Sequence, residues 1–123
     1  MAHNPVIWFE IYVQDMDRAK TFYESVFQTQ LARIDGPEMD MWGFTMQMDQ
    51  VGASGSLVRM EGIRSGGNST IVYFTCNDCA IEEARAEELG AKIHQKKMSI
   101  GEYGYISLLY DTEGNMIGLH SMK

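Results

Sequence analysis

The chain has 123 residues, with 10 Lys and Arg against 17 Asp and Glu, which gives a formal net charge of −7 and a pI near 4.8. Its length predicts a single domain, residues 1–123, that can bury a core without disulfides. The acidic balance, with no basic stripe, argues against a nucleic-acid partner. No run approaches the roughly 18 apolar residues of a membrane span, and the N-terminus, where His3 lies in a predicted tail, is not typical of a signal peptide. We therefore expect no membrane partner and a cytoplasmic location.

The first predicted strand alternates in polarity along residues 7–13. One face carries apolar residues and is predicted to meet the core: Ile7, Phe9, Ile11 and Val13. The other face places the carboxylate of Glu10 between the rings of Trp8 and Tyr12, because alternate side chains of a strand share a face. This second face is the first candidate for a binding surface.

A helix and three short strands are predicted to complete the first half. Asp15 is a suitable N-cap, and apolar residues then recur at helical spacing over residues 19–26. Strands are predicted over 31–34, 41–48 and 56–60, with a chain break at Gly36-Pro37. The strand over 41–48 places Trp42 on one face together with Phe44, Met46 and Met48.

The second half repeats this plan after a flexible connector at residues 65–69. A strand over 70–76 precedes a helix that is capped by Asp78 or Asn77, runs to Leu89 and is closed by Gly90. Further strands are predicted over 91–94, 105–111 and 116–121. Each half thus has the order βαβββ, with module one at about 5–62 and module two at about 69–123. Because neither half is large enough to fold alone, the two are expected to pack together and to form a pocket between them.

Two motifs resemble the vicinal oxygen chelate superfamily, which includes glyoxalase I, extradiol dioxygenases and the bleomycin- and fosfomycin-resistance proteins. They are Asp15-x-x-Arg18-Ala19-x-x-Phe22-Tyr23 and Asp111-x-x-Gly114-Asn115-x-Ile117-x-Leu119. Trp8-Phe9-Glu10 and Ile117-Gly118-Leu119-His120 resemble the first and last strands of its glyoxalase-like branch. The resemblance implies an α+β fold in which two tandem βαβββ modules form curved mixed sheets around a cleft. It also implies a homodimer.

The same resemblance implies four metal-ligand positions, normally His, Glu or Gln, in the first and last strands of each module. Transferred to this chain, three of these positions fall on Trp8, Ile71 and Gly118, and the fourth falls within residues 54–58. None of these residues offers a histidine or carboxylate donor, and a divalent ion needs several converging N, O or S donors. We therefore predict no metal site and no cofactor.

Two polar residues remain as candidates for catalysis. Strand alternation places Glu10 and His120 on the faces that line the cleft in the related fold, where a carboxylate and an imidazole could act as acid and base. They could instead bond to each other or to neighbouring hydroxyl groups and serve the fold alone, or they could contact a ligand. A redox role for Cys76-x-x-Cys79 is disfavoured because no thioredoxin-like context accompanies it.

Four aromatic residues suggest a flat apolar ligand held between rings: Trp8, Tyr12, Trp42 and Tyr73. For Trp42, ordinary core packing is an equal alternative. With Glu10 and His120 they form the predicted ligand-binding set. The leading hypothesis is a metal-free protein that sequesters a small aromatic or cationic molecule, as bleomycin-resistance proteins do. One alternative is a glyoxalase-like lyase or isomerase that uses Glu10 and His120 or a non-standard metal site, and another is an interaction domain without a ligand.

Overall fold

The computed structural model describes residues 4–35 and 39–123, so the predicted break at Gly36-Pro37 and the predicted tail position of His3 lie outside the described residues. Within those ranges the order is β1 (Trp8–Tyr12), α1 (Met16–Phe27), β2 (Ala32–Ile34), β3 (Asp40–Gly43), β4 (Ser54–Arg59), β5 (Val72–Thr75), α2 (Cys79–Glu88), β6 (Lys92–Ser99), the short 3₁₀ helix η1 (Gly101–Tyr103), β7 (Tyr105–Tyr110) and β8 (Met116–Ser121).

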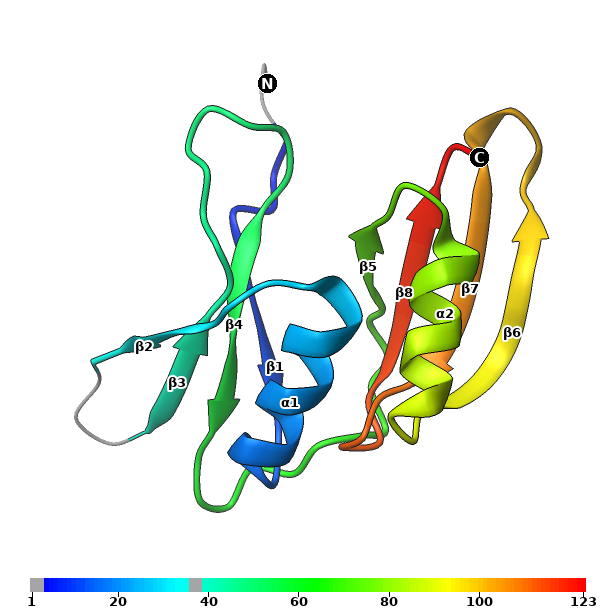
Figure 1. Cartoon of the computed structure of the whole chain (residues 1–123). Helices are drawn as coiled ribbons and strands as arrows, with labels where there is room; N and C mark the ends of the chain where they lie inside the picture. The colour runs from blue at the N-terminus through cyan, green and yellow to red at the C-terminus, as the bar shows by residue number, and fades with distance from the viewer. Residues whose placement is uncertain (1–3, 36–38) are drawn as a thin grey trace.

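The strands form two four-stranded sheets of the same topology, which confirms the predicted fold class. Sheet A has the order β1-β4-β3-β2 and sheet B has the order β5-β8-β7-β6. In each sheet the first strand pairs in parallel with the last, and the other pairs are antiparallel. Figure 1 shows the two sheets side by side, with α1 beside sheet A and α2 over sheet B. The fold is α+β, with two βαβββ modules.

Both helices begin at the predicted caps. The Asp15 carboxylate accepts a hydrogen bond from Arg18 N, and the Asp78 carboxylate accepts one from Ala80 N, so each satisfies an N–H group that the first turn leaves unpaired. Gly90 follows the end of α2 with a φ of 98°, a left-handed conformation that glycine adopts without a Cβ clash. No helix in residues 4–35 and 39–123 is long and apolar enough to cross a membrane.

One hydrophobic core joins the two modules on the helix side. The apolar stripe of α1 is buried in it, and Tyr23 is completely buried. Phe27 of α1 stacks on Phe74 of β5 with ring centroids 4.5 Å apart, and Phe74 also meets Phe9 of β1 edge-on at 6.1 Å. Because β1 and β5 both turn these rings toward the helices, their alternate residues must face away from the core.

Two strands differ from their predicted lengths. β3 ends at Gly43 rather than at Met48, and Met46 and Met48 lie in the following loop, 51% and 88% exposed. β6 extends to Ser99, well beyond the predicted residues 91–94. It is an edge strand with two register shifts, and polar residues such as Gln95 and Lys97 occupy its half-buried positions, so the sequence pattern hides it.

The turn between β7 and β8 holds module one against module two through the carboxylate of Glu113. This carboxylate accepts hydrogen bonds from the backbone N–H groups of Gln14 and Asp15 at 2.8 and 2.9 Å. It also accepts hydrogen bonds from the Arg18 guanidinium, from Nε at 2.6 Å and from Nη2 at 3.0 Å. The Glu113 side chain is fully buried, whereas that of Arg18 is half exposed. A glutamate of module two therefore binds the start of a helix in module one.

Two further residues of the same turn extend this contact. The Asp111 carboxylate accepts bonds from the buried Tyr23 hydroxyl and from the N–H groups of Glu113 and Asn115. The Asn115 amide donates to Tyr12 O and accepts from Gly66 N. The turn thus fixes β1, α1 and the inter-module connector at once, and we call residues 111–115 the clamp turn.

The charge of Glu113 should contribute measurably to stability. Burial alone would raise its pKa, but the Arg18 guanidinium and the two N–H groups of Asp15 and Gln14 outweigh burial and lower the pKa below 4.5. A lowered folded pKa gives stability that is complete above the unfolded pKa and is lost as the pH falls through the folded pKa.

We expect Glu113→Gln to lower the free energy of unfolding by about 2 kcal/mol at pH 7, because the buried side chain loses the charge that strengthens its hydrogen bonds. Urea unfolding should measure this loss and should show it shrinking below about pH 4. Glu102→Gln, which removes the same charge from an exposed turn, is the control. Equal stability of the two variants would contradict the role of the clamp turn.

Candidate functional site

β1 presents three polar and aromatic side chains on the face that points away from the helices. Ile11 is buried in the core, so Trp8, Glu10 and Tyr12 project from the opposite face of the strand. The exposed Glu10 carboxylate accepts a bond from the Tyr12 hydroxyl at 2.9 Å and from Trp8 Nε1 at 3.4 Å. The two rings therefore hold the carboxylate between them, as the alternation predicted.

Sheet A adds a serine that sequence reasoning missed. Parallel pairing sets Ser56 of β4 beside Glu10, so both side chains lie on the same face. Ser56 is fully buried, and its hydroxyl has no hydrogen-bond partner among the described residues. Such a group is costly to leave unpaired. The register between β1 and β4 could have identified it, but alternation within one strand could not.

Sheet B contributes a tyrosine and a histidine to its face away from the helices. Tyr73 is 48% exposed and pairs in register with Gly118. A Cβ atom on Gly118 would lie 2.4 Å from the Tyr73 ring, so this glycine allows the ring to lie across the strand. His120 Nε2 is 2.6 Å from the carbonyl oxygen of Tyr103 in η1. No hydrogen bond joins His120 to Glu10 in the part of the chain that the structure describes.

Trp42 is not brought together with the other predicted ligand-binding residues. Antiparallel pairing sets it beside Leu57, whose side chain is in the core, so Trp42 faces the helices. Lys20 of α1 places its Nζ 3.3 Å from the centroid of the indole ring, and Trp42 Nε1 donates to Asp40 at 3.0 Å. This placement matches the alternative that Trp42 packs against the core, whereas Trp8 and Tyr12 lie on the other face.

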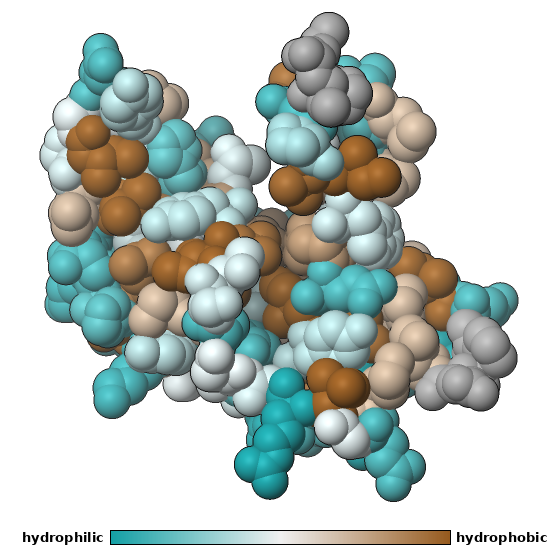
Figure 2. All heavy atoms as spheres, turned by 180° about the vertical axis from the view of Figure 1, so that it is seen from behind, coloured by the Kyte–Doolittle hydropathy of each residue, from teal (hydrophilic) through white to brown (hydrophobic). Residues whose placement is uncertain are grey.

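A crevice of about 290 Å³ runs along the free edge of β1. It is lined by residues of β1, the connector and the start of β5 and β8: Phe9, Glu10, Ile11, Tyr12, Arg64, Gly66, Asn68, Thr70, Val72, Asn115, Met116 and Ile117. Figure 2 views the molecule from behind and shows hydrophobic residues exposed in the middle of this face, between two lobes. Arg64 is the lining residue of most chemical interest that sequence reasoning missed, since it lies just before the connector, in the loop between β4 and β5 and outside any predicted strand.

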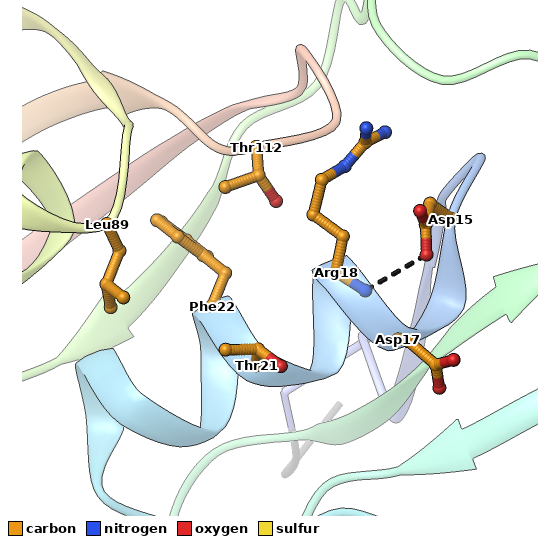
Figure 3. A pocket seen from close by; sticks show the side chains of 7 residues that line it. All are labelled: Asp15, Asp17, Arg18, Thr21, Phe22, Leu89 and Thr112. Carbon is orange, nitrogen blue, oxygen red and sulfur yellow. Dashed lines mark hydrogen bonds between the residues drawn. The ribbon is translucent and has the colours of Figure 1, made fainter.

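A second hollow, of about 380 Å³, lies between α1 and the clamp turn. Figure 3 shows Asp15, Arg18 and Thr112 around it, with the bond from Arg18 N to Asp15 dashed. Two of the three charged residues here already have structural partners, because Asp15 caps α1 and Arg18 binds Glu113. This hollow is therefore part of the junction between modules and is a weaker candidate for a ligand site.

The residues at the implied metal positions do not fit a metal ion. Trp8 offers an indole and Gly118 offers no side chain, while Ser56, within the range of the fourth position, offers one neutral hydroxyl. Within residues 4–35 and 39–123, no group of three His, Cys, Asp or Glu side chains could hold a metal. No reaction step through a metal at these positions is therefore derived.

The two cysteines do not form a reactive pair. Both thiols are free, and Cys79 is fully buried. Burial, reinforced by the nearby charge of Glu82, raises the pKa of Cys76 to about 12. Because the thiolate is the reactive form, this environment disfavours thiol chemistry at neutral pH.

Comparison with known proteins identifies the family. The sequence model of the glyoxalase/bleomycin resistance protein/dioxygenase superfamily matches residues 6–119. The chain belongs to this superfamily. No curated protein matches the sequence significantly.

Solved structures of the superfamily share the fold at low sequence identity. TnmS3, an antibiotic binding protein from Streptomyces sp. CB03234, is 24% identical with a TM-score of 0.68, and the match covers 98% of each chain. A domain from Frankia sp. EAN1pec is 14% identical with a TM-score of 0.74, covering 99% of this chain and 100% of the other. Glyoxalase I of Leishmania major is 15% identical with a TM-score of 0.71, covering 97% and 87%. At these identities the likeness concerns the fold alone.

The hydrogen bond between Tyr12 and Glu10 should be visible in a titration. This bond is the main cause that raises the pKa of Tyr12 above 10.0, with burial and the charge of Glu10 adding to it. We expect Glu10→Gln to lower the pKa of Tyr12 toward its ordinary value. Carbon-13 NMR of ring-labelled tyrosine would measure it, and Tyr12→Phe would assign the resonance. An unchanged titration would show that the bond does not persist in solution.

Proposed function

We propose that this superfamily member binds a small aromatic molecule with a cationic or hydroxyl group on the face away from the helices, and sequesters it without chemical change. The observation that carries the proposal is the exposed Glu10 carboxylate held between Trp8 and Tyr12. Aromatic rings beside a fixed carboxylate are suited to a flat molecule with a polar end, since the rings stack on it and the carboxylate receives its donor.

The charge environment of Glu10 supports a cationic end in particular. No lysine, arginine or histidine side chain pairs with Glu10 among the described residues, which differs from Asp78, paired with Lys97, and Glu113, paired with Arg18. An ammonium group can complete such a site, and charge-assisted hydrogen bonds are about twice as strong as neutral ones. The net charge of −7 also favours approach of a cation.

Binding is favoured over acid–base catalysis because the two candidate groups are engaged separately. His120 bonds to the Tyr103 carbonyl, whereas Glu10 bonds to the rings beside it. The residues at the implied metal positions offer no set of ligands that could replace this pair. A fold shared with an antibiotic binding protein is consistent with sequestration.

Tryptamine and tryptophol are matched probes, because they differ only in a cationic or hydroxyl end. In titration calorimetry, we expect Glu10→Gln to weaken the binding of tryptamine about tenfold, a loss of about 1.4 kcal/mol in binding free energy. The binding of tryptophol should weaken much less. Trp8→Ala should abolish binding of both, while Glu61→Gln, at an exposed site, should change neither. EDTA should have no effect on binding. Affinities indifferent to both substitutions would place the ligand elsewhere.

We also propose that the protein forms a closed two-fold homodimer through a largely apolar surface at one end of sheet A. A hollow of about 890 Å³ lies between the N-terminal segment and the loop before β4. Among the described residues that line it none is ionisable, although the exposed Asp49 lies in the same loop and the chain carries a net charge of −7. Large apolar residues are exposed there, including Val6 at 64%, Met48 at 88% and Val51 at 95%. Two acidic copies can meet on such a surface with little repulsion, and exposed apolar patches often mark interfaces.

Analytical ultracentrifugation should find a dimer at high micromolar concentration. Val51→Glu should shift it to monomer, because it places like charges across the two-fold axis. Ile81→Glu is the control, since Ile81 is a half-exposed apolar residue of α2 outside this surface. A monomeric wild-type protein would refute the proposed dimer.

A further inference from the structure

We propose that the crevice along β1 recognises a carboxylate through Arg64, so that the ligand is a zwitterion of amino-acid type with an apolar aromatic body. This inference rests on the proposed function, since Glu10 supplies the site for the cationic end. It adds the opposite end of the molecule and a residue to bind it.

Glu10 and Arg64 are the two charged residues in the crevice lining, and they carry opposite charges. They do not pair with each other, and Arg64 makes no hydrogen bond or ion pair with any other described residue. Pairing of two exposed charges contributes only about 0–1 kcal/mol, so neither group is tied to the other and both remain available to a ligand. Held apart on the same crevice, they match a ligand that carries both charges.

The backbone of β1 adds neutral hydrogen-bonding groups between these charges. The Tyr12 carbonyl points to the free edge of β1, where the Asn115 amide donates to it at 2.9 Å. In a strand paired on one side, alternate residues direct their backbone groups to the same edge. The N–H and C=O of Glu10 therefore also point into the crevice, and no described residue bonds to them. They can serve the amide or amino group of a ligand.

The rest of the lining fits an apolar body. Phe9, Val72, Met116 and Ile117 supply hydrophobic surface, and the volume of about 290 Å³ is near the lower limit for small-molecule sites. A chain with a net charge of −7 repels an anion at a distance, so a ligand carboxylate needs a local cation. Arg64 is suited to this role, because its planar guanidinium binds a carboxylate with two parallel bonds.

Four indole compounds test the proposal in titration calorimetry at neutral pH: tryptamine, indole-3-propionate, L-tryptophan and tryptophanylglycine. The first two carry one charge each, and the two zwitterions differ in the spacing of ammonium and carboxylate. We expect at least one zwitterion to bind more tightly than tryptamine and far more tightly than indole-3-propionate. Arg64→Gln should weaken the binding of that zwitterion about tenfold and leave the affinity for tryptamine unchanged.

Arg33→Gln removes the same charge from β2, on the far edge of sheet A, and should affect no compound. The role of Arg64 is refuted, while the proposed function stands, if tryptamine binds and neither zwitterion binds more tightly than it. The same conclusion follows if Arg64→Gln weakens the binding of tryptamine and of the zwitterion equally. If neither tryptamine nor a zwitterion binds, the proposed function fails and this inference fails with it. The extra affinity that Arg64 gives the zwitterion should decrease as the salt concentration rises, because the contact is partly exposed and is screened by salt.

Discussion

The carboxylate of Glu113 is the interaction on which the arrangement of the two modules depends. It satisfies two N–H groups at the start of α1 and the guanidinium of Arg18, all in module one, from a turn in module two. The position also suits the helix dipole, because a negative charge near a helix N-terminus is stabilising. Asn115, two residues on, bonds to Tyr12 O and to Gly66 N. The crevice between the edge of β1 and the start of β8 is therefore held at a fixed width by the same turn that joins the modules.

The shared core explains why the aromatic residues of β1 are available to a ligand. Phe9 and Ile11 use one face of the strand to pack beneath the helices, together with Phe74 from the other module. Trp8 and Tyr12 lie on the opposite face and bond to Glu10 instead. A strand that only supported the fold would not require a carboxylate between two rings on its outer face, since that arrangement contributes nothing to the core.

Alternation within a strand was sufficient to predict the face of Glu10, whereas relations between strands were not predictable. Trp42 also alternates correctly, but only its pairing with Leu57 shows that its face is the helix side. Ser56 becomes part of the site through its register with Glu10. His120 is engaged by a carbonyl in η1, a short 3₁₀ turn that no periodicity indicates. Arg64 lies in the loop between β4 and β5, where no repeat restricts its direction. The fold follows from local patterns, whereas the site depends on contacts between segments distant in sequence.

These contacts also determine how the protein can discriminate between charged ligands. The net charge of −7 acts over long distances and enriches cations generally, but salt screens such fields beyond about 8 Å at physiological ionic strength. Selection between one cation and another must therefore occur within the crevice. Under the proposed function, Glu10 alone would accept any aromatic amine that the rings can stack against. Arg64, in the role inferred for it, would add a requirement that long-range attraction cannot supply, because its guanidinium would bind a carboxylate that the rest of the acidic surface repels. A ligand bearing both charges would then contact both residues, and the selectivity for it would depend on how far apart the clamp turn holds β1 and the loop that carries Arg64.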